Sequence, residues 1–205
     1  MILCKWEDLP DNMRIEEVKP YYDILSRKKG QLLLKRIFDF AVALIMLIVL
    51  CIPIAIISVW IKLDSEGPVF YRQERVTTNG KHFRIHKFRT MVSNADKIGT
   101  QVTVGNDSRI TKVGKKLRHI RLDELPQLID VLQGTMSFVG TRPEAVKYVE
   151  QYKPEYMATL LMPAGITSET SIYYKDEDIL LSNAENALND AKTAKADAEK
   201  NLKDA

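Results

Sequence analysis

"FAVALIMLIVLCIPIAIISVWI", residues 40–61, is a continuous run of 22 residues without a charged side chain. A helix of that length reaches roughly 33 Å, slightly more than the roughly 30 Å of the hydrocarbon core of a bilayer. The run is therefore long enough for a membrane-spanning helix. A buried helix in the core of a soluble protein is the less expected alternative.

Two features of this run favour a re-entrant helix over a full span. Pro53 lies inside the run, where a proline removes a backbone donor and kinks a helix. Basic residues also flank both ends, with Lys35 and Arg36 before the run and Lys62 after it. A helix that bends at Pro53 and returns to its own leaflet keeps both flanks on the cytosolic side. A full span stays open as an alternative, because prolines also occur in spanning helices.

The overall composition says less than the distribution of charge. The chain has 205 residues and a formal net charge of +3. Basic residues cluster before the apolar run and again from Arg72 to Arg121, which suits anionic headgroups, phosphorylated ligands or nucleic acid. Cys4 and Cys51 do not make a disulfide framework, so we expect a reducing compartment. The N-terminal stretch lacks the pattern of a signal peptide, so the apolar run should remain in the mature protein.

Local patterns predict an α/β fold that is mostly helical. Asn79-Gly80 supplies the positive φ angles of a tight turn, which predicts a β-hairpin over residues 69–91. A short basic helix is expected over 113–120, and apolar spacing predicts a helix from Leu125 that ends at Gly134. Residues 137–144 should form a turn that opens onto another helix, and 162–168 a further turn. Arg36 and Asp39, three residues apart on the first helix, are expected to pair.

An acidic pair, Asp123 and Glu124, directly precedes the helix expected from Leu125. The conservative interpretation is that Asp123 caps this helix, which would contribute about 1 kcal/mol. A helix start also stabilises an anion and attracts phosphate. In that setting Asp123 can act as a nucleophile on phosphorus while Glu124 holds Mg²⁺. The two interpretations are compatible.

Basic residues before and after the acidic pair are candidates for phosphate binding. A guanidinium group matches phosphate oxygens two at a time. The candidates are Arg89, Arg118 and Arg142, with Lys87 as a point charge. Taken alone, each of these side chains is explained more simply as a solvated surface cation.

Six segments that occur in order carry a resemblance to a known family: KRIFDF, the apolar run with its proline, GPVFYRQERV, KFRTM, RLDELPQL and MSFVGTRPE. From about Leu34 to Ile172 the chain closely resembles the bacterial monotopic phosphoglycosyl transferases, also called the bacterial sugar transferase family. The resemblance implies an enzyme that moves a sugar-1-phosphate from a nucleoside diphosphate sugar, usually a UDP-sugar, onto membrane polyprenyl (undecaprenyl) phosphate. UMP would be released, and the lipid-linked product would begin a surface glycan.

The resemblance also implies roles for single residues. Asp123 matches the aspartate that forms a covalent phosphosugar intermediate, and Glu124 matches its Mg²⁺-binding partner. The matches to substrate-binding positions are Lys87, Arg89, Arg118, Arg142 and Pro143. The membrane helix of the family is re-entrant, which implies an inner-membrane protein whose catalytic domain lies on the cytosolic face.

The chain departs from the family pattern at several positions. Cys51-Ile52-Pro53 stands where the family has Ser-Pro, and Thr141 replaces the first proline of a Pro-Arg-Pro turn. Thr135 stands where aspartate is common, and the Ala-, Lys- and Asp-rich residues 184–205 do not resemble the C-terminal segment of the family. These departures leave an alternative, a catalytically impaired or truncated member of the same fold that acts as a scaffold.

We therefore expect four segments: an N-terminal arm (1–33), a re-entrant membrane helix (34–62), a small cytosolic catalytic domain with a short β-hairpin (63–183) and an appendage (184–205). A nucleic-acid-binding module is disfavoured, because Phe83 alternates with Arg84 and places rings and charges on opposite faces. His82 and His86 are expected on a solvated polar face rather than in a metal site, and residues 107–109 in a turn with a local ion pair. The sequence names neither the sugar nor the oligomeric state.

Overall fold

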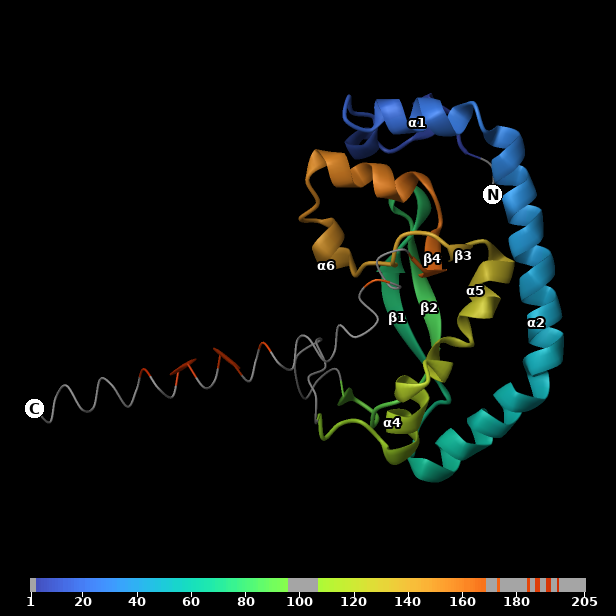
Figure 1. The fold of residues 1–205 in the computed structure, drawn as a ribbon, viewed down its shortest axis with the longest axis vertical. Coiled ribbons are helices and arrows are strands. Elements are labelled where there is room, and N and C mark those ends of the chain that lie inside the picture. Colours follow the sequence, from blue (N-terminus) through green and yellow to red (C-terminus); the bar gives the residue numbers. More distant parts are fainter. Residues whose placement is uncertain are drawn as a thin grey trace, which may run out of the picture.

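The computed structural model describes residues 3–95 and 107–168, together with isolated positions further on: Tyr173, Ala184, Ala187, Leu188, Ala191, Lys192 and Lys195. Within these residues the fold is mixed α/β and mostly helical, as predicted, with one long helix beside two small sheets (Figure 1). Most of the predicted appendage lies outside the described residues, and the four predicted segment boundaries stay predictions.

The apolar run forms the middle of a single long helix, α2 (Lys29–Asp64). Among the described residues it is the one helix long and apolar enough to cross a membrane, with a mean hydropathy of 3.2 over its most apolar window. Pro53 lies inside it, and the hydroxyl of Ser58 donates to the carbonyl of Ile54 at 2.7 Å. Figure 1 shows α2 running along one side of the molecule and bending before its last turns approach α4 (Lys112–His119). The predicted re-entrant course through a bilayer stays a prediction.

The inner face of α2 packs on the rest of the fold on both sides of Pro53. Before the proline, the buried Ala43 packs with Leu128 and Val131 of α5 (Gln127–Gln133). After it, Ile57 and Ile61 pack with Val113 and Leu117 of α4 and with Phe88. Outward-facing residues remain exposed, including Ile45, Ile48, Val49, Ile52, Ile56 and Val59. One stripe of the helix is therefore part of the core, and the opposite stripe is an uncovered apolar surface.

Arg36 does not pair with Asp39 as predicted. Its guanidinium donates to the carbonyl oxygens of Val131 at 2.6 Å and Leu132 at 2.8 Å. The carbonyl of Val131 also accepts the amide of Gly134 at 3.1 Å, so the guanidinium is a further donor to the last carbonyls of α5. Asp39 instead pairs with Lys35 at 2.9 Å and accepts the hydroxyl of Ser137 at 2.7 Å. These bonds hold the N-terminal half of α2 to the domain.

The predicted hairpin is confirmed. Strands β1 (Phe70–Val76) and β2 (His82–Phe88) are antiparallel, with Arg75 opposite Phe83 and Tyr71 opposite Lys87. The connecting 3-10 turn η3 (Thr78–Gly80) has φ angles of 56° at Asn79 and 69° at Gly80. A positive φ costs little at asparagine and glycine, which is why this dipeptide fixes the register.

A second sheet was not predicted. Strand β3 (Met136–Val139) pairs in parallel with β4 (Ala164–Thr167), in the stretch for which a turn was expected. The backbones approach closely beside the sheet, since a Cβ added to Gly165 would lie 2.2 Å from the nitrogen of Gly140. The prediction of a turn was wrong because these glycines serve close packing rather than chain reversal. The helix expected after Pro143 is only the short α6 (Val146–Val149).

The N-terminal arm is folded onto the domain. It contains the 3-10 turns η1 (Trp6–Asp8) and η2 (Asp11–Met13) and the helix α1 (Lys19–Ser26). Its apolar side chains form a cluster with Leu160 and Leu161 of η5 (Pro154–Leu161). Met13 and Val18 are fully buried in that cluster. The arm is thus a structural part of this fold.

We expect Gly114→Ala to lower the stability of the fold. A Cβ at this position would lie 2.0 Å from the carbonyl oxygen of Thr90, so α4 would have to move away from the end of β2. Overpacking of this kind typically costs about 1–3 kcal/mol. Thermal unfolding followed by circular dichroism should show a lower midpoint.

Gly30→Ala is the matched control. Gly30 also lies in a helix, but no atom lies within 4 Å of its added Cβ. Alanine favours a helix over glycine, so its midpoint should stay equal or rise. A Gly114→Ala midpoint equal to that of the unchanged protein would contradict the packing described for α4.

Candidate functional site

The acidic pair lies in a 3-10 turn, η4 (Leu122–Glu124), that follows Arg121 in the left-handed region at a φ of 54°. The next helix, α5, begins at Gln127 with Pro126 as its N-cap residue and no side-chain cap bond. The prediction that Asp123 caps this helix was therefore wrong, because the turn places the carboxylate too far before the first helical residue. With seven residues, α5 also supplies only a weak dipole.

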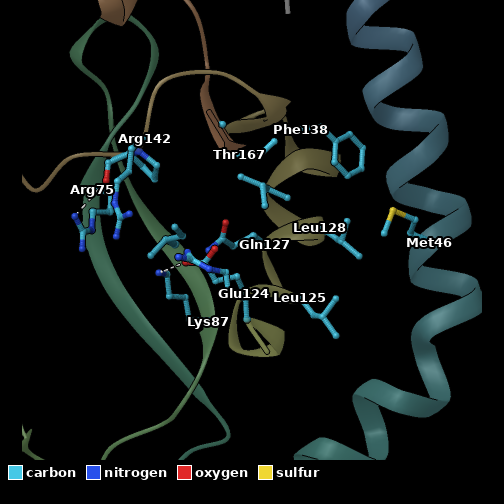
Figure 2. A pocket seen from close by; sticks show the side chains of 15 residues that line it. Met46, Arg75, Lys87, Glu124, Leu125, Gln127, Leu128, Phe138, Arg142 and Thr167 are labelled. Carbon is cyan, nitrogen blue, oxygen red and sulfur yellow. Dashed lines mark hydrogen bonds and ion pairs between the residues drawn. The ribbon is translucent and has the colours of Figure 1, made fainter. Parts of the chain in front are cut away.

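A cavity of about 350 Å³ opens beside this turn, between the hairpin, α5 and α2 (Figure 2). Its apolar wall includes Met46 of α2, with Leu128 and Phe138. Its basic wall is made by Arg75, Lys87, Arg121 and Arg142. A cavity with one apolar and one cationic wall suits a ligand that carries phosphate.

The predicted residues divide into two groups by position. Four of them line the cavity: Lys87, Glu124, Arg142 and Pro143. Asp123 and Arg118 do not line it, although Arg118 is close enough to Asp123 to act on its pKa. Arg89 also lies outside the lining.

Lys87 and Glu124 form the central ion pair of the site, with 2.7 Å between Nζ and Oε1. Both side chains are about three-quarters buried, at 23% and 24% exposed. Burial acts to raise the pKa of Glu124, but Lys87, Arg142 and Arg121 outweigh it and hold that pKa below its usual value. Glu124 is therefore an anion at neutral pH and joins η4 to strand β2.

The pKa of Asp123 is shifted in the opposite direction, above its usual value. Burial raises the pKa of this carboxyl, and the neighbouring charge of Glu124 adds to the rise. Lys87 and Arg118 act to lower the pKa of Asp123 but do not cancel these effects. Two adjacent carboxyls in one turn therefore differ in how readily they bind a proton.

Arg89 and Arg118 make structural contacts. The guanidinium of Arg89 donates to the carbonyls of Ser65 at 2.6 Å and Glu66 at 2.8 Å, which ties the end of β2 to the end of α2. Arg118 donates from Nε to the hydroxyl of Thr90 at 2.8 Å. A substrate contact for either residue stays a prediction, and the bonds of Arg89 favour a structural role.

Sequence reasoning missed Arg75, which lines the cavity and donates to the carbonyl of Pro143 at 3.2 Å. Paired residues of an antiparallel hairpin share a face. With the turn at Asn79-Gly80 known, the register places Arg75 on the same face as Ile85 and Lys87. The signal was therefore present in the hairpin pattern.

The histidines behave differently from each other. His82 is exposed and lies 3.0 Å from Glu74. His86 is buried, so the prediction of a solvated face was wrong for it: its backbone amide donates to Asp130 Oδ2 at 2.8 Å, and its Nδ1 lies 2.7 Å from Oδ1. This pair locks β2 to α5 beside Lys87. In the described part of the chain no group of three or more His, Cys, Asp or Glu side chains is placed to hold a metal ion.

The turn expected near residue 107 is confirmed. Arg109 pairs with Asp107, with 2.5 Å between Nη2 and Oδ2. The hydrogen bonds from Arg109 lower the pKa of Asp107 to about 2. This pair is a local structural feature away from the cavity lining.

Comparison with known proteins identifies relatives of the chain. The model of the family described as bacterial sugar transferase matches residues 30–197. A UDP-glucose:undecaprenyl-phosphate glucose-1-phosphate transferase of Escherichia coli (strain K12) is 43% identical over 168 residues, which cover 78% of this chain and 36% of that protein. A putative undecaprenyl-phosphate N-acetylgalactosaminyl 1-phosphate transferase of Bacillus subtilis (strain 168) is 42% identical over 132 residues, covering 64% of this chain and 74% of that protein.

The chain thus spans about a third of the length of the E. coli relative and about three-quarters of the B. subtilis relative. The family match extends from the start of α2 through the hairpin, the acidic turn and the second sheet. It therefore includes every residue of the candidate site. The chain belongs to the bacterial sugar transferase family.

Proposed function

We propose that the chain transfers a sugar-1-phosphate from a UDP-sugar to polyprenyl phosphate, undecaprenyl phosphate in bacteria, through a covalent intermediate on Asp123. The observation that carries this proposal is the acidic turn beside the basic cavity, with Lys87 and Glu124 paired at 2.7 Å. The relatives named above act on undecaprenyl phosphate by their names. The product would begin the assembly of a surface glycan.

In the first step, a carboxylate oxygen of Asp123 attacks the phosphorus that carries the sugar. The bond from that phosphorus to the bridging oxygen breaks, and UMP leaves with the electron pair. In the second step, an oxygen of polyprenyl phosphate attacks the same phosphorus, and the carboxylate of Asp123 is released. A half-buried carboxylate is poorly hydrated, which makes it a better nucleophile than an exposed one.

The basic wall of the cavity supports binding of the diphosphate. Arg75, Arg121 and Arg142 line it, and a guanidinium binds phosphate oxygens in pairs. Lys87 neutralises Glu124 and would turn partly toward an incoming phosphate. These cations reduce the repulsion between an anionic nucleophile and an anionic substrate.

We further propose that Glu124 holds Mg²⁺ when the nucleotide sugar is bound. Mg²⁺ commonly binds through one or two carboxylates together with substrate phosphates and water, so the small carboxylate set here fits that use. The lowered pKa of Glu124 keeps this ligand anionic, although burial opposes it. When bound, the ion would offset negative charge on the diphosphate.

The position of α2 in the membrane is also a proposal. Arg36, near the start of α2, is bonded to α5, and near its end the carboxylate of Asp64 accepts the backbone amide of Val113 at 3.0 Å. A straight span across a bilayer would separate these two attachments by the membrane thickness. A bent, re-entrant α2 keeps both ends beside one domain, on the cytosolic face where nucleotide sugars occur.

We expect Asp123→Asn to abolish both turnover and the labelled phosphosugar adduct, because an amide oxygen is a far weaker nucleophile. The assay incubates purified protein with polyprenyl phosphate and a panel of UDP-sugars and measures UMP. The matched control is Asp8→Asn, at an exposed aspartate in η1, which should keep full activity. EDTA should stop the reaction and added Mg²⁺ should restore it.

Retained activity in Asp123→Asn would end the nucleophile assignment. Absence of UMP release by the unchanged protein with every UDP-sugar of the panel would instead favour the scaffold alternative. The first outcome would show that the nucleophile is another residue, and the second that the proposed activity itself is wrong.

The raised pKa of Asp123 predicts the acid limb of the pH profile. The nucleophile is active only when deprotonated, so adduct formation should fall as pH drops through a pKa above the ordinary aspartate value. Since Lys87 acts to lower that pKa, Lys87→Gln should move the acid limb to higher pH. Single-turnover adduct formation measured against pH tests both statements, and an unmoved limb in the variant would contradict the coupling.

The proposed re-entrant course of α2 predicts that both flanks of this helix lie on the cytosolic side. Single cysteines at Lys28 and Glu66, both exposed, are introduced in a protein whose Cys4 and Cys51 are changed to serine. An impermeant maleimide should label both positions in inverted inner-membrane vesicles and neither in spheroplasts. Labelling of the two positions from opposite sides would rule out the re-entrant course.

A further inference from the structure

Helix α4 has one strongly basic face that the proposed reaction does not use. Lys112, Lys115, Lys116 and His119 recur at the spacing of one helical face, and all four are exposed. The other face, with Val113 and Leu117, is buried against α2. None of these basic residues lines the cavity. Packing therefore requires the buried face, and the basic face is available to a partner.

This basic face adjoins the apolar end of α2. The Nζ of Lys116 lies 5.3 Å from the ring centroid of Trp60, and Figure 1 shows the last turns of α2 beside α4. Trp60 is 40% exposed, and its neighbours Val59 and Leu63 are 58% and 81% exposed. Tryptophan beside lysine is the usual composition of a protein surface at the boundary between lipid headgroups and acyl chains.

The positive charge of this face is not neutralised by the described residues. Their salt bridges involve other lysines, such as Lys19, Lys35 and Lys87. The carboxylate of Asp64 contacts α4 through the backbone amide of Val113, at the start of the helix. The lysine ammonium groups thus present their charge outward, next to exposed apolar side chains.

We propose that the basic face of α4 binds the anionic headgroups of bilayer phospholipids and so holds the domain where α2 leaves the membrane. The occupant is the bilayer rather than an acidic protein, because the charges continue directly into the exposed apolar surface around Trp60. Each lysine near an anionic membrane surface contributes about fivefold to binding. The inference rests on the proposed membrane seat of α2 and adds a lipid preference to it.

The test is quenching of Trp60 fluorescence in nanodiscs. The full-length protein carries Trp6→Phe, so that Trp60 is the remaining tryptophan. Phosphatidylglycerol or phosphatidylcholine is brominated on the same acyl carbons and added at equal mole fraction to an otherwise identical mixture of the two lipids. We expect about twofold stronger quenching by the brominated anionic lipid, since the lysines enrich it near the ring.

The decisive variant changes Lys112, Lys115 and Lys116 to glutamine. The two brominated lipids should then quench Trp60 equally, as they should for the original protein in 1 M salt, where the screening length falls to about 3 Å. The matched control changes three other exposed lysines, Lys81, Lys147 and Lys153, to glutamine. It removes the same charge at positions away from α4 and should keep the preference for the anionic lipid.

Three outcomes would overturn the inference in distinguishable ways. Equal quenching by the two lipids in the original protein would leave α2 in the membrane but remove the anionic preference, and it would favour a soluble acidic partner for α4. Absence of quenching by either lipid would show that Trp60 does not contact the bilayer, and the proposed membrane seat would fail with it. Loss of the preference in the control variant would mean that net charge, not the face of α4, attracts the lipid.

Discussion

The attachment of α2 to one domain on both sides of Pro53 is the constraint on which the rest of the structure depends. Before the proline the attachment is polar as well as apolar: Arg36 donates to the last carbonyls of α5, and Ala43 packs with Leu128 and Val131 of the same helix. After the proline it is mainly apolar, through Ile57 and Ile61. A charged group that satisfies a buried helix end is expensive to remove. The apolar helix is therefore part of the folded unit rather than a separate anchor.

This attachment also brings the apolar helix to the chemistry. Met46 of α2 lines the same cavity as Lys87 and Glu124 (Figure 2). A lipid phosphate that approaches along α2 would meet a cationic wall within the same cavity that we propose for the nucleotide sugar. For a reaction between a water-soluble donor and a membrane acceptor, joining the two environments at one cavity shortens the path between them. The geometry of α2 thus matters for the proposed reaction as much as the acidic turn does.

Features set by local sequence were predicted well, and features set by distant contacts were not. Asn79-Gly80 fixes a hairpin within a few residues, and Gly134 ends a helix in the same way. The pairing of β3 with β4 depends on residues almost thirty positions apart, so the sequence of neither strand alone predicts the pairing. Arg36 was assigned to the nearest carboxylate in the sequence, whereas its partners are carbonyls of α5 that only the fold brings close. His86 was judged by strand alternation alone, and its buried partner Asp130 lies on another element.

The acidic pair shows why adjacency in sequence does not mean equivalence in the site. In the 3-10 turn after Arg121, Glu124 lines the cavity and pairs with Lys87, whereas Asp123 does not line the cavity. Glu124 is thereby fixed as an anion, although burial opposes this, while burial and the adjacent Glu124 raise the pKa of Asp123 despite Lys87. Glu124, which stays charged, suits the binding of cations. Asp123 suits attack on phosphorus, because a nucleophile held in a strong ion pair is less reactive. The difference between the two carboxyls therefore follows from the burial of Asp123 beside a charged neighbour and from the ion pair and nearby arginines that hold Glu124 as an anion.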